Sequence, residues 1–202
     1  MSGYPKARWN VLAQPRITPT RAAGPLEVLA LRISRLRAHS RTNLNVVTTF
    51  LRLRRIFFNH LLLVSQLLMH GRKISRADKE RIVLRVGWHM GNVYEWSHHT
   101  ALALREGVPQ DEIDSFALQD SPLWSERTRA FIACVDELIA TNTLSPQSWN
   151  RLRAQLCESA AMEFCMLVGH YVMVAMAINS LGVQVEEQFR LGPLPQPAAA
   201  LR

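Results

Sequence analysis

The residues best suited to chemistry lie in the segment Gly91-Asn-Val-Tyr-Glu-Trp-Ser-His-His-Thr100. Glu95 and His99 are four positions apart, so on a helix they lie about one turn apart on the same face. A carboxylate that reaches an imidazole fixes its tautomer, and such a pair can move protons to and from a substrate. An exposed Glu–His pair on a protein surface has the same spacing, so the pattern alone leaves both interpretations open.

Two further features of this segment limit what it can do. His98 points about 100° away from His99 on a regular helix, so we do not expect both histidines to face one cavity. A metal site needs three or four convergent ligands, and Glu95, His98 and His99 form a poor set at this spacing. We therefore expect no metal ion at these residues.

Helices must position these residues, because no segment of the chain alternates between apolar and polar residues at period two. We predict an all-α fold in which Ser75 and Ser125 each begin a helix and Gly91 ends one. Apolar periodicity and caps predict helices over 25–36, 46–69, 75–91, 93–105, 109–117, 125–140, 145–156 and 159–183. The stretch 160–183 is the most apolar, and we expect a helix buried on all sides in a soluble core rather than a membrane span.

The predicted organisation is a single domain with two flanking segments. Residues 1–24 contain three prolines and little periodicity and read as an extended arm. Residues 25–185 form one all-α domain, and 186–202 form a Pro- and Ala-rich tail. The runs that begin at Ser75 and Ser125 are weakly similar and each precedes an apolar helix, which indicates an internal helical repeat.

The three cysteines, Cys134, Cys157 and Cys165, show no CxxC spacing and lie in apolar helical segments. An odd number of cysteines in this context is typical of reduced core thiols, and a disulfide scaffold is not expected. No apolar core of a secretory signal follows Lys6 and Arg8 near the N-terminus. We expect a soluble, cytoplasmic protein.

Three motifs resemble the carboxymuconolactone decarboxylase/alkylhydroperoxidase-like family over 41–183. They are Ser75-Arg-Ala-Asp-Lys-Glu-Arg-Ile-Val-Leu-Arg-Val, Tyr94-Glu-Trp-Ser-His-His, and the run from Leu167 to Asn179. In the peroxidase branch a glutamate is followed by a CxxC pair and then by a histidine. The resemblance places the glutamate on Glu80, the histidine on His99, and the two cysteines on Asn92 and Glu95. Both redox cysteines are thus replaced, which disfavours a thiol hydroperoxidase, because that chemistry needs a reactive thiolate and a resolving thiol.

The resemblance implies a helical bundle of the alkylhydroperoxidase-like type and a lyase- or decarboxylase-like enzyme that uses acid–base chemistry without a cofactor. Its substrate would be a small carboxylated molecule or lactone. On this reading Glu80, Glu95 and His99 are catalytic: His99 is the general acid/base, Glu95 its orienting partner or second base, and Glu80 a proton relay. Tyr94, Trp96, His98 and His170 are assigned to substrate binding, with core packing as the alternative for the two aromatic residues and for His170.

Charge is distributed unevenly along the chain. Residues 1–76 carry 14 Lys and Arg against one acid, Glu27, whereas residues 77–202 carry 10 basic and 15 acidic residues. Such a split is compatible with a polyanionic partner. However, the sequence has no nucleic-acid motif, and its arginines are interleaved with apolar residues at helical spacing. We therefore expect no nucleic-acid or membrane partner. The basic third would flank the site, contact another subunit, or attract an anionic substrate. A homo-oligomer, trimeric or larger, is implied by the resemblance, and a non-catalytic binding protein of the same fold is the competing function.

Overall fold

The computed structural model describes residues 9–20, 24–67 and 74–195, and this part of the chain contains helices and no strand. The all-α prediction is thus confirmed. The α-helices are α1 (Pro25–Arg37), α2 (Asn45–Phe50), α3 (Arg54–Ser65), α4 (Arg76–His89), α5 (Val93–Arg105), α6 (Gln110–Ser115), α7 (Glu126–Thr141), α8 (Pro146–Gln155) and α9 (Glu158–Leu181). The described residues also include two short 3₁₀ helices, Leu51–Leu53 and Glu187–Phe189.

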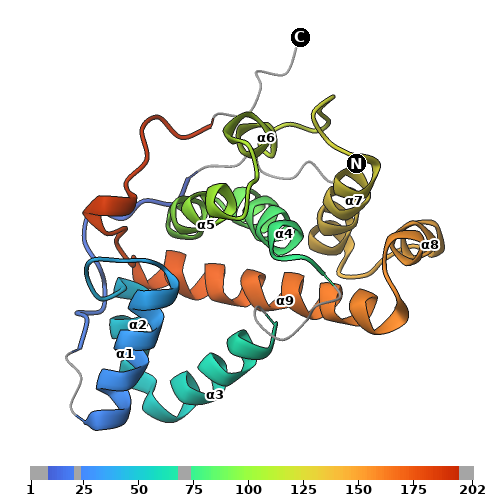
Figure 1. The fold of residues 1–202 in the computed structure, drawn as a ribbon. Helices are drawn as coiled ribbons and strands as arrows, with labels where there is room; N and C mark the ends of the chain where they lie inside the picture. The colour runs from blue at the N-terminus through green and yellow to red at the C-terminus, as the bar shows by residue number, and fades with distance from the viewer. Residues whose placement is uncertain (1–8, 21–23, 68–73, 196–202) are drawn as a thin grey trace.

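The centre of the molecule is built from α4, α5, α7 and α9. The helix α9 runs across the middle, with α4 and α5 on one side and α1 to α3 on the other (Figure 1). The predicted cap at Ser75 is present: its side chain accepts a hydrogen bond from the third residue of α4, and Ser125 caps α7 in the same way. Gly91 has φ 56°, a value that glycine adopts without strain, and so allows the short connection that lays α5 back along α4.

The predicted helix over 46–69 is divided in the structure. It begins at Asn45, passes through the 3₁₀ turn at Leu51–Leu53, and continues as α3 to Ser65, while the predicted end near Gly71 lies outside the described residues. The apolar spacing continues across the division, so the sequence pattern did not reveal it. Residues on both sides of the division still pack together: Val47, Leu51 and Phe57 share one apolar cluster with α1.

The prediction that the 160–183 helix is buried on all sides is wrong. Its inner face packs on the core, but a row of methionines, Met162, Met166, Met173 and Met176, is more than half exposed. In length and composition α9 would also suit a membrane span, although only half of its most apolar stretch is buried and core helices pass the same test. It packs against α4, α7 and α8.

The two flanking segments return to the helical core. Between residues 9 and 20 the chain has no helix; Asn10 N–H donates to Gly91 O, and Arg16 N–H donates to Leu181 O. The first residues of the predicted tail, 186–202, pack on the helical core, since Glu186 and Phe189 are buried. The apolar and aromatic partners available to them on α2 and α5 could not be read from their local sequence.

Candidate functional site

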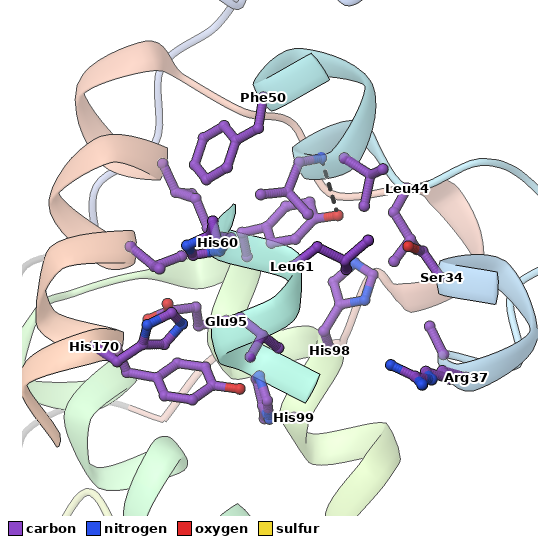
Figure 2. Close-up of a pocket in the computed structure, with 18 of the residues that line it drawn as sticks. Ser34, Arg37, Leu44, Phe50, His60, Leu61, Glu95, His98, His99 and His170 are labelled. Atoms are coloured by element: carbon purple, nitrogen blue, oxygen red, sulfur yellow. Dashed lines mark hydrogen bonds between the residues drawn. The ribbon is translucent and has the colours of Figure 1, made fainter. Parts of the chain in front are cut away.

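A cavity of about 240 Å³ lies between the basic N-terminal helices and the central pair α5 and α9. Its walls are mostly aliphatic and aromatic, and its polar side chains come chiefly from α5 and α9 (Figure 2). The polar and ring-bearing lining residues are Ser34, Arg37, Phe50, Phe57, His60, Tyr94, Glu95, His98, His99, His170 and Tyr171. An apolar cavity with a few convergent polar groups is the usual form of a small-molecule site.

One face of α5 supplies the densest polar group in this cavity. Glu95, His98, His99 and Leu102 all line it, at spacings of three, four and seven residues from the first. These spacings define one broad stripe of a helix, wide enough to include both adjacent histidines. The expectation that His98 and His99 could not face the same cavity is therefore wrong.

His99 is held by a carboxylate from α4 and not by its neighbour on α5. Its Nδ1 lies 2.6 Å from Oε2 of Glu80, and both side chains are about nine-tenths buried. Within the described residues, Nε2 of His99 has no hydrogen-bond partner. The ring of Tyr171 meets the imidazole edge-on at 5.1 Å. Glu80 is thus the hydrogen-bond partner of His99, a role that the sequence analysis gave to Glu95. The packing of α4 against α5 brings residues 80 and 99 together.

Glu95 is the most unusual group of the site. It is 3 % exposed, and neither carboxylate oxygen has a hydrogen-bond partner within the described part of the chain. Burial raises its pKa well above the usual range for a glutamate, because the charged form has lost its water. The structure therefore favours a neutral carboxylic acid at this position, which can donate a proton.

A second carboxylate–imidazole pair lies beside the first and was missed at the sequence level. Oε2 of Glu186 lies 2.6 Å from Nε2 of His98, and Oε1 accepts hydrogen bonds from the Tyr94 hydroxyl and from the backbone N–H of Asn45. Burial pushes the pKa of Glu186 upward, but the hydrogen bond and charge of His98 outweigh it, and the pKa lies below its ordinary value. Burial, and then the Glu186 charge, raise the pKa of Tyr94.

The ring of His98 is covered on both faces. Tyr94 stacks on it at 4.3 Å with an interplanar angle of 21°, and Phe189 lies 4.1 Å from it on an element after α9. The only sequence signal for this pair was a glutamate and a phenylalanine in a segment with no helical pattern. Nothing in that segment indicated which histidine it would meet.

A third group of titratable side chains, His60 and His170, joins α3 to α9. Their rings stack at 4.8 Å with an interplanar angle of 22°, and both line the cavity. Burial lowers the pKa of His60, and burial together with the His60 ring lowers that of His170 to about 4. Nδ1 of His170 is buried without a partner among the described residues.

Trp96 does not reach the cavity, so its predicted role in substrate binding is wrong. It follows Glu95 directly and therefore points to another side of α5, where it packs with Trp9 and Trp88 at ring distances of 5.6 and 6.3 Å. Tyr94, His98 and His170, the other predicted binding residues, do line the cavity.

The cysteines lie outside the cavity, and the described residues form no cluster suited to a metal ion. None of the three cysteines lines the cavity; burial raises the pKa of Cys134 to about 11 and raises that of Cys165. In the part of the chain that the structure describes, no three His, Cys, Asp or Glu side chains converge so that they could hold a metal ion.

Comparison with known proteins gives a family match and several structural neighbours. The model of the carboxymuconolactone decarboxylase family matches residues 57–137. No curated protein sequence matches at a significant level.

The solved structures that resemble the chain share its fold at low sequence identity. The debrominase Bmp8, as a cysteine-to-alanine variant in complex with 2,3,4-tribromopyrrole, has a TM-score of 0.73 at 18 % identity and covers 88 % of this chain and 95 % of its own. A peroxidase-related protein with an alkylhydroperoxidase AhpD core from Ralstonia eutropha JMP134 has a TM-score of 0.75 at 16 % identity, over 87 % and 94 %. A peroxidase-related protein from Silicibacter sp. TM1040 has 0.73 at 13 %, over 93 % and 97 %.

The two positions at which the family pattern has redox cysteines have other functions in this structure. Asn92 caps α5, since its side chain accepts a hydrogen bond from the N–H of Glu95 at 2.9 Å, and its amide donates to Ala175 O. Glu95 is the unpartnered buried acid. The chain thus contains a region that matches the carboxymuconolactone decarboxylase family, has the fold of alkylhydroperoxidase-like proteins, and lacks the CxxC pair.

Proposed function

We propose that this protein is an acid–base enzyme of the decarboxylase type, acting without a redox thiol on a small carboxylated substrate. The observation that carries the proposal is the pairing of Glu95, a buried acid with no partner among the described residues, with the Glu80–His99 pair on the same cavity. Burying an unpaired carboxyl group is unfavourable, and groups whose pKa is perturbed in this way concentrate at functional sites.

The arrangement gives the two groups complementary roles. With its proton on Nδ1, His99 donates a hydrogen bond to Glu80 and presents the lone pair of Nε2, which can accept a proton from a substrate. Neutral Glu95 can donate one. In a decarboxylation, loss of CO₂ leaves its electron pair on the substrate as an enolate, which takes the proton of Glu95. Nε2 of His99 then takes a proton from water and returns it to the Glu95 carboxylate, and the remaining hydroxide combines with the released CO₂ as bicarbonate. General acid–base help of this kind is worth about 10²–10⁴-fold in rate.

Arg37 supports a carboxylated substrate. It comes from the basic third of the chain and lines the cavity, and among the described residues no carboxylate lies within ion-pair distance of it. A guanidinium group binds a carboxylate through two parallel hydrogen bonds, so Arg37 can hold a carboxylate that does not react. The concentration of arginines in residues 1–76 then attracts anionic substrates toward this face.

The comparisons support this function at a coarser level. The family takes its name from a decarboxylase, and the debrominase of the same fold was crystallised with a small halogenated ring. A thiol hydroperoxidase remains disfavoured, because the cysteines lie away from the cavity and burial raises the pKa of two of them. We expect serine at Cys134, Cys157 and Cys165 to leave turnover unchanged, provided that the variant unfolds at the same temperature as the unmodified protein.

The test follows both steps of the chemistry in heavy water. A panel containing 4-carboxymuconolactone and simple enolisable carboxylic acids is incubated with the protein in D₂O, and NMR records CO₂ loss and deuterium incorporation. We expect Glu95→Gln and His99→Gln to lose at least about 10²-fold of the rate. Glu187→Gln, which removes an exposed acid outside the cavity, should keep it.

Two outcomes would contradict the proposal. One is turnover that survives in both Glu95→Gln and His99→Gln. The other is tight binding of the panel compounds with no exchange or CO₂ loss above buffer, which is the behaviour of a non-catalytic binding protein of the same fold.

A further inference from the structure

The stacked histidines His60 and His170 have no role in the proton transfers above, yet both line the same cavity. In Figure 2 they lie on one side of the cavity, His98 and Arg37 lie toward the other side, and Glu95 lies between. His170 is 7 % exposed. Its position is fixed on both sides, because Tyr171 also meets it edge-on at 5.4 Å.

One ring nitrogen of His170 has no hydrogen-bond partner among the described residues. Nδ1 is buried and makes no hydrogen bond with any described residue. Leaving such an atom without a partner is unfavourable, and natural proteins seldom do so without a functional reason. A group on a molecule bound in the cavity can supply the missing partner.

Burial restricts which group that partner can be. The low pKa of His170 keeps its imidazole neutral at physiological pH, and burial acts in the same direction on His60. A neutral imidazole does not attract an anion, but it exchanges hydrogen bonds readily with a hydroxyl, which can both donate and accept. The surrounding Phe50, Phe57 and Val174 favour an apolar ring next to that hydroxyl.

We propose that His170 is a specificity residue that binds a ring hydroxyl of the ligand, with His60 stacked on it as a positioning residue. Together with Arg37, this makes the cavity selective for a monocyclic hydroxy-carboxylate: the carboxylate lies toward Arg37, and the hydroxyl bonds to His170. A cavity of about 150 Å³ holds benzene, so 240 Å³ suffices for a ring with two substituents. The carboxylate half of this assignment rests on the proposed function, whereas the hydroxyl half stands on His170 alone.

The experiment compares two probes that differ only in the hydroxyl group. Calorimetry at pH 7.5 measures the Kd of 4-hydroxybenzoate and of 4-methylbenzoate, which have the same shape and charge. We expect the unmodified protein to bind 4-hydroxybenzoate at least about tenfold more tightly, as one hydrogen bond to a buried unpaired group implies. His170→Phe keeps a ring against His60 but removes both nitrogens, and should reduce the ratio of the two Kd values to about one.

His60→Phe is the matched control, because it preserves the stacking and leaves the nitrogens of His170 in place. We expect it to keep the preference for the hydroxyl, whereas His60→Ala, which removes the stacked ring, should weaken it. Thermal unfolding checks that each variant is folded. The inference is overturned if the unmodified protein shows no preference, if neither probe binds at millimolar concentration, or if folded His170→Phe keeps the preference.

The two proposals fail separately. A preference for the hydroxyl that depends on His170, in a protein without exchange activity, would leave this inference intact and remove the enzymatic one. Exchange that depends on His99, without any hydroxyl preference, would do the reverse.

Discussion

Two carboxylate–imidazole pairs of nearly the same length lie next to each other on α5, and they differ in what surrounds them. In both, a carboxylate oxygen lies 2.6 Å from a ring nitrogen. His98 is covered by Tyr94 on one face and Phe189 on the other, and its carboxylate Glu186 is tied to two further donors. His99 meets the ring of Tyr171 edge-on, and within the described residues the carboxylate of Glu80 has no hydrogen-bond partner other than His99. In each pair the second ring nitrogen makes no hydrogen bond with a described residue.

The difference lies in the surroundings of the two pairs and not in the Glu–His contact itself. In the Glu186–His98 pair the imidazole has a ring on each face and the carboxylate accepts from three donors. These contacts join the segment after α9 to α2 and α5. The Glu80–His99 pair has fewer neighbours of this kind, and it shares the cavity with Glu95, whose carboxylate oxygens have no partner among the described residues and whose pKa is raised by burial. The less covered ring and the unpartnered acid on the same cavity, rather than the pair itself, are the grounds on which we propose proton transfer at His99.

The largest expected effect is on turnover when each histidine is replaced by glutamine. His99→Gln should lower the rate of CO₂ loss and deuterium exchange by about 10²–10⁴-fold, because no base remains beside Glu95. His98→Gln should change it less than about tenfold, since His98 acts on structure. The comparison is reversed if His98→Gln, still folded by circular dichroism, is the more damaged of the two.

The next effect is on the free energy of unfolding, where the order of the two pairs is opposite. Glu186→Ala removes the acceptor of His98, Tyr94 and Asn45 and should destabilise the protein by about 2–3 kcal/mol. Glu80→Ala leaves one imidazole nitrogen unpaired, and we expect about 1 kcal/mol. Urea unfolding measures both, and equal losses would show that the two pairs do not differ structurally.

A smaller effect separates the two tyrosines that touch the histidines. Tyr94→Phe removes the buried hydrogen bond to Glu186 and the acceptor of the Val46 N–H, and should destabilise the protein by about 1 kcal/mol without changing kcat. The hydroxyl of Tyr171 makes no hydrogen bond within the described residues, so Tyr171→Phe should be nearly neutral in stability. A drop in stability for Tyr171→Phe as large as that for Tyr94→Phe would weaken the comparison.

The smallest effect concerns how stability depends on pH. The pKa of Glu95 is raised in the folded protein, so the folded state keeps a proton that the unfolded chain has already lost. Stability therefore falls as the pH rises from the unfolded pKa of about 4.5 toward the folded value, and the loss is complete above it. Glu95→Gln removes this loss, so its melting temperature relative to the unmodified protein should increase with pH between 5 and 8. A difference that is independent of pH would show that Glu95 is charged in the folded state.

Much of the fold followed from local signals in the sequence. The bounds predicted for 93–105 are those of α5, and the serine cap predicted for α4 is present, because helix starts are set by residues near each other in sequence. The division of the 46–69 helix was not predictable, since apolar spacing continues through it. The exposed methionine row of α9 was missed for a similar reason: methionine is apolar, so the pattern did not distinguish the exposed face of the helix from the buried one.

The site was only partly predictable because it depends on contacts between distant segments. The resemblance indicated Glu80, Glu95 and His99, and α5 does present Glu95 and His99 to one cavity. The partner of His99 changed from Glu95 to Glu80 once the packing of α4 against α5 was known. Glu186 and Arg37 come from segments whose local pattern carries no functional signal, so only the tertiary structure brings them to the site.

The most direct test of the account is the position of the proton on each of the two histidines. Multiple-bond ¹H–¹⁵N correlation spectra of protein labelled at histidine, recorded at pH 8, distinguish the two neutral tautomers and the doubly protonated ring. The bonds to Glu80 and Glu186 predict opposite tautomers: His99 protonated at Nδ1 with a bare Nε2, and His98 protonated at Nε2. A proton on Nε2 of His99, or a doubly protonated His99, would contradict the claim that it is the base of the site.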